Sequence, residues 1–109
     1  MTIETAPINV HAMRNAAAQA SHFLRSMANA DRLMLLCQLS QGELGVSDLE
    51  ELTGIRQPSL SQQLGILRRE GLIVPRKMGK KVFYSIGEPK VLVMIQQLYE
   101  LFCNEGRGS

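Results

Sequence analysis

The sequence predicts a mainly helical domain with one β-hairpin, a winged helix-turn-helix that forms a homodimer. The spacing of apolar residues, or signals at helix ends, predicts four helices in the first 71 residues. A segment in which side chains alternate every second residue follows and predicts strands, and another apolar helix comes last. Two short helices joined by a tight glycine turn are typical of a helix-turn-helix. The basic residues cluster on that motif and on the hairpin after it.

The composition restricts the class of protein. The chain has 109 residues, of which 45% are hydrophobic and 5% aromatic, a length that predicts one domain with a modest core. No run of eighteen apolar residues and no signal-peptide pattern occurs, so we expect no membrane span and a cytoplasmic location. Because the chain has only two histidines and no Trp, it has little material for an elaborate active site, and we expect no enzyme.

The first two helices follow from spacing and capping. A flexible arm of residues 1–10 should precede a helix over residues 11–27, where apolar residues recur every three or four positions. Asn29 is a favourable N-cap residue and predicts the start of a second helix that ends near Ser40.

The next two helices form the expected helix-turn-helix. Ser47 and Glu50 match a capping box, which predicts a short third helix that ends before Gly54. Pro58 favours the first turn of a fourth helix, which should end near Gly71. The leucines of this fourth helix share one face and should point inward: Leu60, Leu64 and Leu67.

A hairpin and a last helix complete the domain, which should span residues 11–103. Residues 72–76 and 81–86 are expected to be strands, because apolar and polar residues alternate in the second segment. The last helix should run from about Glu88 to Cys103, before a frayed tail of residues 104–109. Its apolar surface is wider than one core-facing stripe requires, and the excess predicts a second copy of the chain as partner.

The basic charge is concentrated in one segment. Between Arg56 and Lys81 there are seven basic residues and one acidic residue, whereas the net charge of the whole chain is only +2. Duplex DNA is contacted mainly through its phosphates by Arg and Lys. The segment therefore predicts double-stranded DNA as the partner, with a solvated charged face as the alternative interpretation.

Two sets of side chains are candidates for DNA contact. The start of the fourth helix should reach base edges in the major groove through Gln57, Ser59, Ser61 and Gln62, although the two serines have an alternative role as helix caps. The candidates for phosphate or minor-groove contact are basic: Arg56, Arg69, Arg76, Lys77, Lys80 and Lys81. A two-fold dimer would present two such helices about 34 Å apart to an inverted-repeat operator.

The sequence resembles the ArsR/SmtB family of repressors over about residues 17–103. The segments that carry the resemblance are LRSMANADRL at 24–33, SDL at 47–49, SLSQQL at 59–64, LRREGLI at 67–73 and VFYSI at 82–86. The resemblance implies a dimeric winged-helix repressor that leaves its operator when an inducer binds. The family's two metal-site patterns are missing, since residues 45–47 read Gly-Val-Ser and residues 91–101 hold only Glu100 as an acidic or histidine ligand. We therefore expect no metal and no cofactor.

Cys37 and Cys103 are similar to the cysteines of the BigR, SqrR and HlyU branch of that family, which senses reactive sulfur species or oxidants. The resemblance implies that a persulfide or polysulfide joins the two thiols by a disulfide or longer sulfur bridge and lowers operator affinity. Without the resemblance, two cysteines on apolar helix faces are more often inert core residues. Two alternatives stay open: a thiol-bound metal, metalloid or haem as inducer, and a protein-interaction module without DNA binding.

Overall fold

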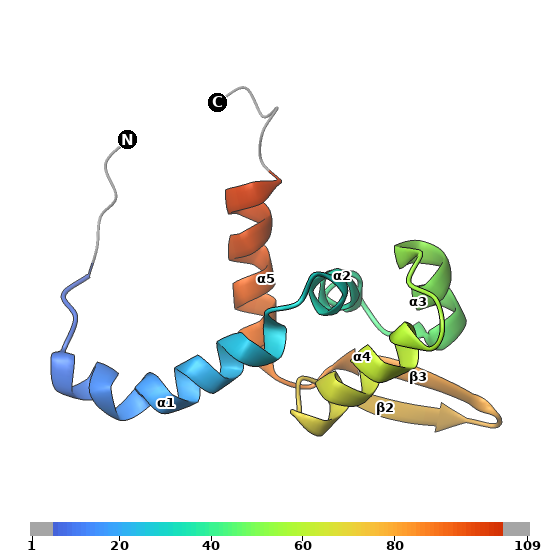
Figure 1. Ribbon diagram of the computed structural model, residues 1–109, viewed down its shortest axis with the longest axis horizontal. Helices are drawn as coiled ribbons and strands as arrows, with labels where there is room; N and C mark the ends of the chain where they lie inside the picture. Colours follow the sequence, from blue (N-terminus) through green and yellow to red (C-terminus); the bar gives the residue numbers. More distant parts are fainter. Residues whose placement is uncertain (1–5, 104–109) are drawn as a thin grey trace.

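The computed structural model describes residues 6–103, and in this range it shows five helices and a three-stranded antiparallel sheet (Figure 1). The helices are α1 (Val10–Met27), α2 (Ala30–Leu39), α3 (Val46–Thr53), α4 (Ser59–Arg69) and α5 (Pro89–Phe102). The strands are β1 (Leu44–Gly45), β2 (Ile73–Met78) and β3 (Lys81–Ile86). This order confirms the predicted winged helix-turn-helix. Within the described range, no helix combines the length and the apolar character that a membrane crossing requires.

Short polar side chains fix the starts of the first two helices. Asn29 caps α2 as predicted, because its side-chain oxygen accepts a hydrogen bond of 3.0 Å from the Arg32 N–H. Asn9 caps α1 in the same way, so this helix begins at Val10, one residue before the expected start. The described part of the predicted arm is therefore residues 6–9. Residues 1–5 and the predicted tail, residues 104–109, lie outside the described residues.

Helix α3 begins earlier than the expected capping box. Its N-cap is Gly45, whose N–H donates a hydrogen bond of 3.0 Å to the carboxylate of Asp48. Ser47 thus lies inside the first turn, and the prediction that it caps the helix is wrong. The reason is that Leu44 and Gly45 form β1, which pairs with β3 and leads directly into the helix. The end of α3 is as predicted, since Gly54 has a φ of 75° and stops the helix in the left-handed conformation.

The wing is the hairpin of β2 and β3. The strand order is β1-β3-β2, and the pairing of Met78 with Lys81 leaves a two-residue turn at Gly79 and Lys80. Gly79 has a φ of 65°, a conformation that such tight turns require and that glycine adopts without strain. β2 is an edge strand, so it accommodates Pro75, which has no N–H to donate.

The core lies between α2, α3, α4, β2 and α5. Its largest fully buried side chains are aliphatic: Leu35, Leu36, Leu49, Leu60, Leu67, Ile73 and Val91. Leu64 is also buried, so the inward face of α4 is as predicted. Burial of a leucine or isoleucine in such a core contributes about 1.5–3 kcal/mol, so this cluster fixes α4 and the wing on the body.

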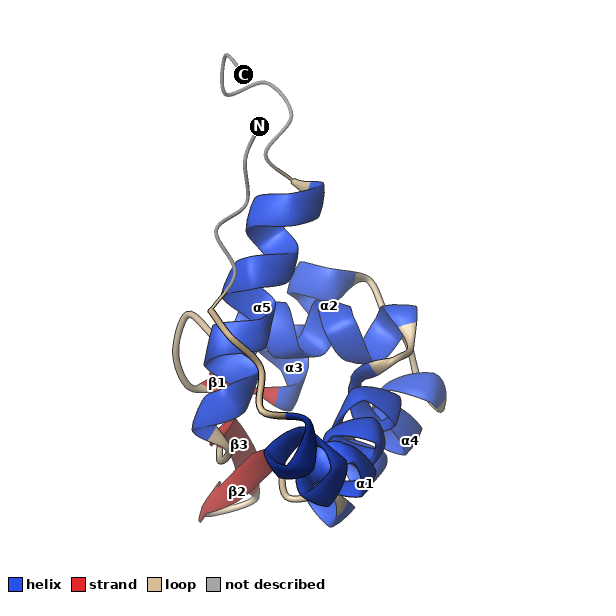
Figure 2. Ribbon diagram, turned by 90° about the vertical axis from the view of Figure 1, so that its left-hand side faces the viewer, coloured by secondary structure: helices blue, strands red, loops and turns tan. Residues whose placement is uncertain are grey.

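Helix α1 and the second half of α5 extend away from the core (Figures 1 and 2). Of the 18 residues of α1 only Ser26 and Met27 are buried. Both helices expose large apolar side chains, namely Val10, Met13 and Leu24 on α1 and Leu92, Val93, Tyr99, Leu101 and Phe102 on α5. One chain alone therefore leaves a large apolar surface uncovered.

Candidate nucleic-acid interface and cysteine groove

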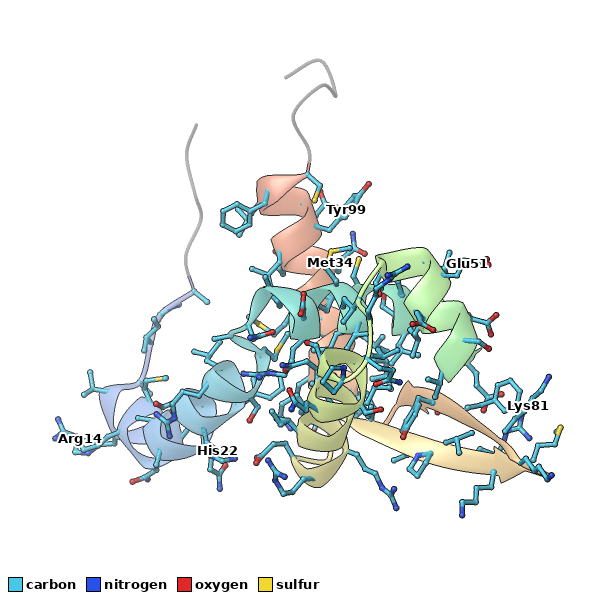
Figure 3. All side chains as sticks on the ribbon, turned by 45° about the vertical axis from the view of Figure 1, so that its right-hand side comes forward. Arg14, His22, Met34, Glu51, Lys81 and Tyr99 are labelled. Carbon is cyan, nitrogen blue, oxygen red and sulfur yellow. The ribbon has the colours of Figure 1, made fainter. Side chains whose placement is uncertain are left out.

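The predicted DNA-contacting residues lie on the outer side of the helix-turn-helix and wing. The buried leucines of α4 turn its opposite face outward, and Ser61, Gln62 and Arg69 are exposed there. Arg56 and Gln57 are exposed in the turn before α4. Lys77, Lys80 and Lys81 are exposed on the wing, and Figure 3 shows Lys81 at its far end. Phosphates could approach these ammonium groups without displacing core side chains.

Two of the candidate base-reading residues have partners within the chain. The side-chain oxygen of Gln57 accepts a hydrogen bond of 3.0 Å from the Ser61 N–H and so caps α4. The hydroxyl of Ser59 donates a hydrogen bond of 3.3 Å to the Asp31 carboxylate on α2. Gln62 is exposed, and among residues 6–103 its side chain has no hydrogen-bond partner. Gln62 therefore has the free amide that base reading requires.

Arg76 on β2 differs from the lysines of the wing. Its Nε and Nη2 each donate a hydrogen bond of 2.8 Å to the carboxylate of Glu43, and its guanidinium lies 5.2 Å from the centre of the Phe83 ring. The hydrogen bond from Arg76 lowers the pKa of Glu43, and Glu43 in turn raises the pKa of Arg76. The sequence gives no local signal for this pair, whose members are 33 positions apart.

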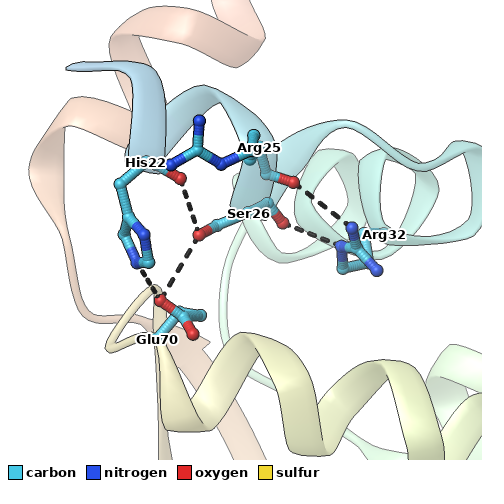
Figure 4. Close-up of polar contacts among 5 residues, drawn as sticks. All are labelled: His22, Arg25, Ser26, Arg32 and Glu70. Atoms are coloured by element: carbon cyan, nitrogen blue, oxygen red, sulfur yellow. Dashed lines mark hydrogen bonds and ion pairs between the residues drawn. The ribbon is translucent and has the colours of Figure 1, made fainter. Parts of the chain in front are cut away.

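The acidic residue within the basic segment, Glu70, faces α1. Its carboxylate forms a hydrogen bond with the imidazole of His22 and accepts a 3.4 Å hydrogen bond from the Ser26 hydroxyl (Figure 4). The hydrogen bond from His22 is the main reason that the pKa of Glu70 is lowered. Because Glu70 is the C-cap of α4, this contact holds the end of that helix against α1.

Arg32 completes the polar contacts that join three helices. From α2 it donates hydrogen bonds to the backbone oxygens of Ser26 and Arg25, at 2.8 and 3.3 Å (Figure 4). Its Nη1 also donates a 2.9 Å hydrogen bond to the side chain of Gln63 on α4. The position of α4 therefore depends on polar contacts to α1 and α2 as well as on its buried leucines.

The two cysteines lie on one groove between α2 and α5. Cys37 is partly buried on α2, Cys103 is exposed at the C-cap of α5, and both are free thiols. Both line a groove of about 280 Å³, called here the cysteine groove, whose other lining residues are Leu33, Met34, Ile95, Leu98, Tyr99 and Phe102. Figure 3 shows Met34 and Tyr99 in the upper part of the molecule, away from Lys81 at the tip of the wing. A sulfur bridge across this groove would join α2 to α5.

A second, polar hollow of about 370 Å³ meets the cysteine groove at Cys37. Its lining combines hydroxyl and amide side chains with Cys37, Ile95 and Tyr99, which it shares with the cysteine groove; the polar residues are Gln38, Ser40, Gln41 and Gln96. The structure brings no group of three or more His, Cys, Asp or Glu side chains together as metal ligands within residues 6–103. The chemistry available at Cys37 and Cys103 is therefore that of two thiols beside one apolar and one polar surface.

Comparisons with known proteins agree with this geometry. Residues 29–74 match the family described as "Bacterial regulatory protein, arsR family". The chain is similar to the biofilm growth-associated repressor of Agrobacterium fabrum, with 42% identity over 93% of this chain and 86% of that protein. It is also similar to the transcriptional activator HlyU of Vibrio cholerae, with 40% identity over 93% of this chain and 94% of that protein.

A solved structure shows the same fold. The transcriptional repressor BigR from Xylella fastidiosa superposes with a TM-score of 0.85 and 38% identity over 88% of this chain and 98% of that chain. Identity of this level over nearly whole chains extends beyond the helix-turn-helix to α5. The chain therefore belongs to the arsR family of bacterial regulatory proteins, and it is a DNA-binding transcriptional regulator and not an enzyme.

Proposed function

We propose that this regulator is a cytoplasmic, homodimeric repressor that senses reactive sulfur species or oxidants through Cys37 and Cys103. The observation that carries the proposal is the cysteine groove, in which two free thiols from distant parts of the sequence line one surface. A buried cysteine with no second thiol nearby would support only a packing role. Two thiols on one groove support a bridge between α2 and α5.

The chemistry consists of two thiol-exchange steps. The thiolate of one cysteine attacks the outer sulfur of a persulfide R–S–S–H, forms a protein persulfide and releases R–S⁻ as the donor's S–S bond breaks. The thiolate of the other cysteine then attacks the Sγ of the first cysteine, closes a disulfide as the Sγ–S bond of the persulfide breaks, and releases HS⁻. The two thiols are oxidised, and the transferred sulfur leaves as sulfide. With a donor R–S–S–S–H, attack on the middle sulfur releases R–S⁻ and leaves Cys–S–S–SH; attack of the second thiolate on the sulfur next to Sγ then releases HS⁻ and closes a trisulfide.

The bridge would act on DNA through the dimer. The exposed apolar side chains of α1, and those of α5 that do not line the cysteine groove, Leu92, Val93 and Leu101, support a dimer interface formed by these two helices. A bridge from α2 to α5 changes how α5 lies on the body, and therefore how the two α4 helices are spaced. A coupling free energy of about 2–3 kcal/mol would weaken operator binding roughly 30- to 150-fold.

In the reduced state the dimer would bind an inverted-repeat operator. Gln62 from each α4 would read a base edge, because its amide is exposed and a glutamine pairs well with adenine. Arg56, Arg69 and the lysines of the wing would neutralise phosphates on either side. The ammonium groups of Lys80 and Lys81 are exposed and have no partner within residues 6–103, which supports this role.

Single serine variants test the proposed sensor. Cys37→Ser and Cys103→Ser should each bind operator DNA as the wild type does, and neither should release it when a persulfide is added. Fluorescence anisotropy of labelled operator measures the affinity, and mass spectrometry follows the gain of single sulfur atoms and the loss of two hydrogens on bridging. Release of DNA from either single variant at the wild-type persulfide concentration would contradict the two-thiol mechanism.

A further inference from the structure

We propose that the cysteine groove selects an uncharged sulfur donor, namely a persulfide with a small alkyl group, over a donor that carries carboxylates, such as glutathione persulfide. This inference rests on the proposed function, because it names the donor for the same two thiols. It follows from the surfaces on both sides of Cys37 and from where the basic residues of the chain lie.

The apolar side favours an alkyl group. Besides the two thiols, the described residues that line the cysteine groove are aliphatic, methionine and aromatic, and none carries a formal charge. Each methylene group that moves from water to such a surface favours binding roughly fourfold. The groove of about 280 Å³ has the volume of roughly nine water molecules, which suits a donor of few heavy atoms better than a tripeptide.

The polar side does not offer a site for carboxylates either. The hollow that meets the groove at Cys37 presents the amides of Gln38, Gln41 and Gln96 and the hydroxyl of Ser40, and none of these side chains carries a charge. A carboxylate that loses its water there would gain hydrogen bonds but no ion pair, and removing an ionised group from water without a paired charge is unfavourable. An anionic donor is therefore disfavoured on both sides of the thiol.

The described basic residues of α1, α2 and the wing lie away from the groove. Arg32, on the same helix as Cys37, donates its hydrogen bonds to the backbone of α1 and to Gln63, and Arg25 donates to Ser21. Neither arginine lines the groove. Figure 3 shows Lys81 on the wing and Arg14 at the start of α1, both away from Tyr99 and Met34. Among residues 6–103, no basic side chain lines the cysteine groove, so this part of the chain offers a carboxylate-bearing donor no ion pair there.

The experiment compares two donors on the reduced protein. Second-order rates of reaction with propyl persulfide and with glutathione persulfide are measured by mass spectrometry, and each is divided by the rate of the same donor with 2-mercaptoethanol. This division removes the intrinsic reactivity of the donors. The normalised rate should be at least about tenfold higher for propyl persulfide, a ratio that the burial of one or two methylene groups gives by itself.

A charge placed in the groove should reduce the preference. Met34→Lys adds an ammonium group at a lining residue of the groove, and it should raise the normalised rate of glutathione persulfide several-fold relative to propyl persulfide. The matched control is Met78→Lys, since Met78 is an exposed methionine on the wing, with 57% of its surface accessible against 45% for Met34. This control adds the same charge away from the groove and should leave the ratio unchanged.

Two results would overturn the inference: equal normalised rates for both donors in the wild type, or a shift by Met34→Lys no larger than that by Met78→Lys. Either result leaves the proposed sensor intact if both donors still release the operator through the two cysteines. Conversely, a tenfold donor preference without any release of DNA would contradict the proposed function and not the selectivity of the groove.

Discussion

The imidazole of His22 on α1 and the carboxylate of Glu70 at the end of α4 form a hydrogen bond, although the two residues are 48 positions apart. The pair lies beside Ser26, one of the only two buried residues of α1. It connects the helix that extends from the body to the helix that would enter the major groove. If α1 forms part of a dimer interface, as proposed above, this contact links that interface to the orientation of α4.

Glu70→Gln should destabilise the protein at neutral pH and much less in acid. The hydrogen bond from His22 lowers the pKa of Glu70 in the folded state. Its stabilising effect is therefore present above the unfolded-state pKa of about 4.3 and is lost as the pH falls through the lower folded-state value. Urea unfolding at pH 7 and at pH 3.5 measures the difference between variant and wild type at each pH.

Glu51→Gln serves as the control for this experiment, because Glu51 is an exposed carboxylate on α3 without a hydrogen bond or ion pair among the described residues. It should change the free energy of unfolding little at either pH. An effect of Glu70→Gln that stays the same from pH 7 to pH 3.5 would mean that the ionised carboxylate does not stabilise the fold.

Lysines of the wing should contribute more to DNA affinity than Arg76 does. Lys81→Gln should lower affinity similarly for all sequences and reduce the slope of log K against log salt by about 0.9 per lost phosphate contact, or about 1.8 for a dimer. Arg76→Gln should change the slope less, because Arg76 already forms two hydrogen bonds with Glu43. Anisotropy titrations over a series of salt concentrations give both slopes, and a larger change for Arg76→Gln would contradict the assignment.

Two glutamines near the start of α4 should differ in their roles. Gln57→Ala removes the side chain that caps the helix at the Ser61 N–H and should lower the free energy of unfolding by about 0.5–2 kcal/mol. Gln62→Ala should leave stability within about 0.5 kcal/mol, because its side chain is exposed and has no partner in the described chain.

Operator affinity separates the same two variants. Gln62→Ala should cost about 1–3 kcal/mol at one base position of each half-site and should lose the preference for that base. Binding to a panel of operators mutated at single positions measures this. Equal affinity of Gln62→Ala and wild type across the panel would exclude base reading by this residue.

Local sequence signals predicted most of the fold. Asn29, Gly54 and Gly79 each fix a cap or turn through their own backbone or side chain, and the start of α2, the end of α3 and the turn of the hairpin lie where the sequence places them. Strand β1 was not predicted, because two residues are too few to show an alternation of side chains. Leu44 and Gly45 form a strand only by pairing with β3. The start of α3 was misplaced for the same reason.

The candidate site was predictable in its composition and not in its pairings. Clustered charge indicated the wing, and the resemblance singled out Cys37 and Cys103, which line one groove. The partners of Arg76 and Glu70 come from segments 33 and 48 positions away, so no window of sequence reveals that these two charges are already paired. Long-range ion pairs of this kind decide which charged residues remain available to a ligand.

The last prediction concerns the dimer. Val93 on α5 has 63% of its surface exposed in the single chain, beside the exposed Leu92 on the same helix. Val93→Asp should weaken self-association by at least about tenfold, because an unpaired carboxylate in an apolar interface is unfavourable. Analytical ultracentrifugation measures the dissociation constant of the dimer, and operators with one or two half-sites measure DNA binding.

The control is Leu52→Asp, at an exposed leucine of α3 with 52% of its surface accessible, which should leave the dimer unchanged. The Val93→Asp variant should bind an operator with one half-site as the wild-type chain does. It should lose most of the additional affinity that a second half-site gives, because two α4 helices are then no longer held at a fixed spacing. A Val93→Asp protein that remains a dimer would place the interface elsewhere and would remove α5 as the route from the sulfur bridge to the DNA.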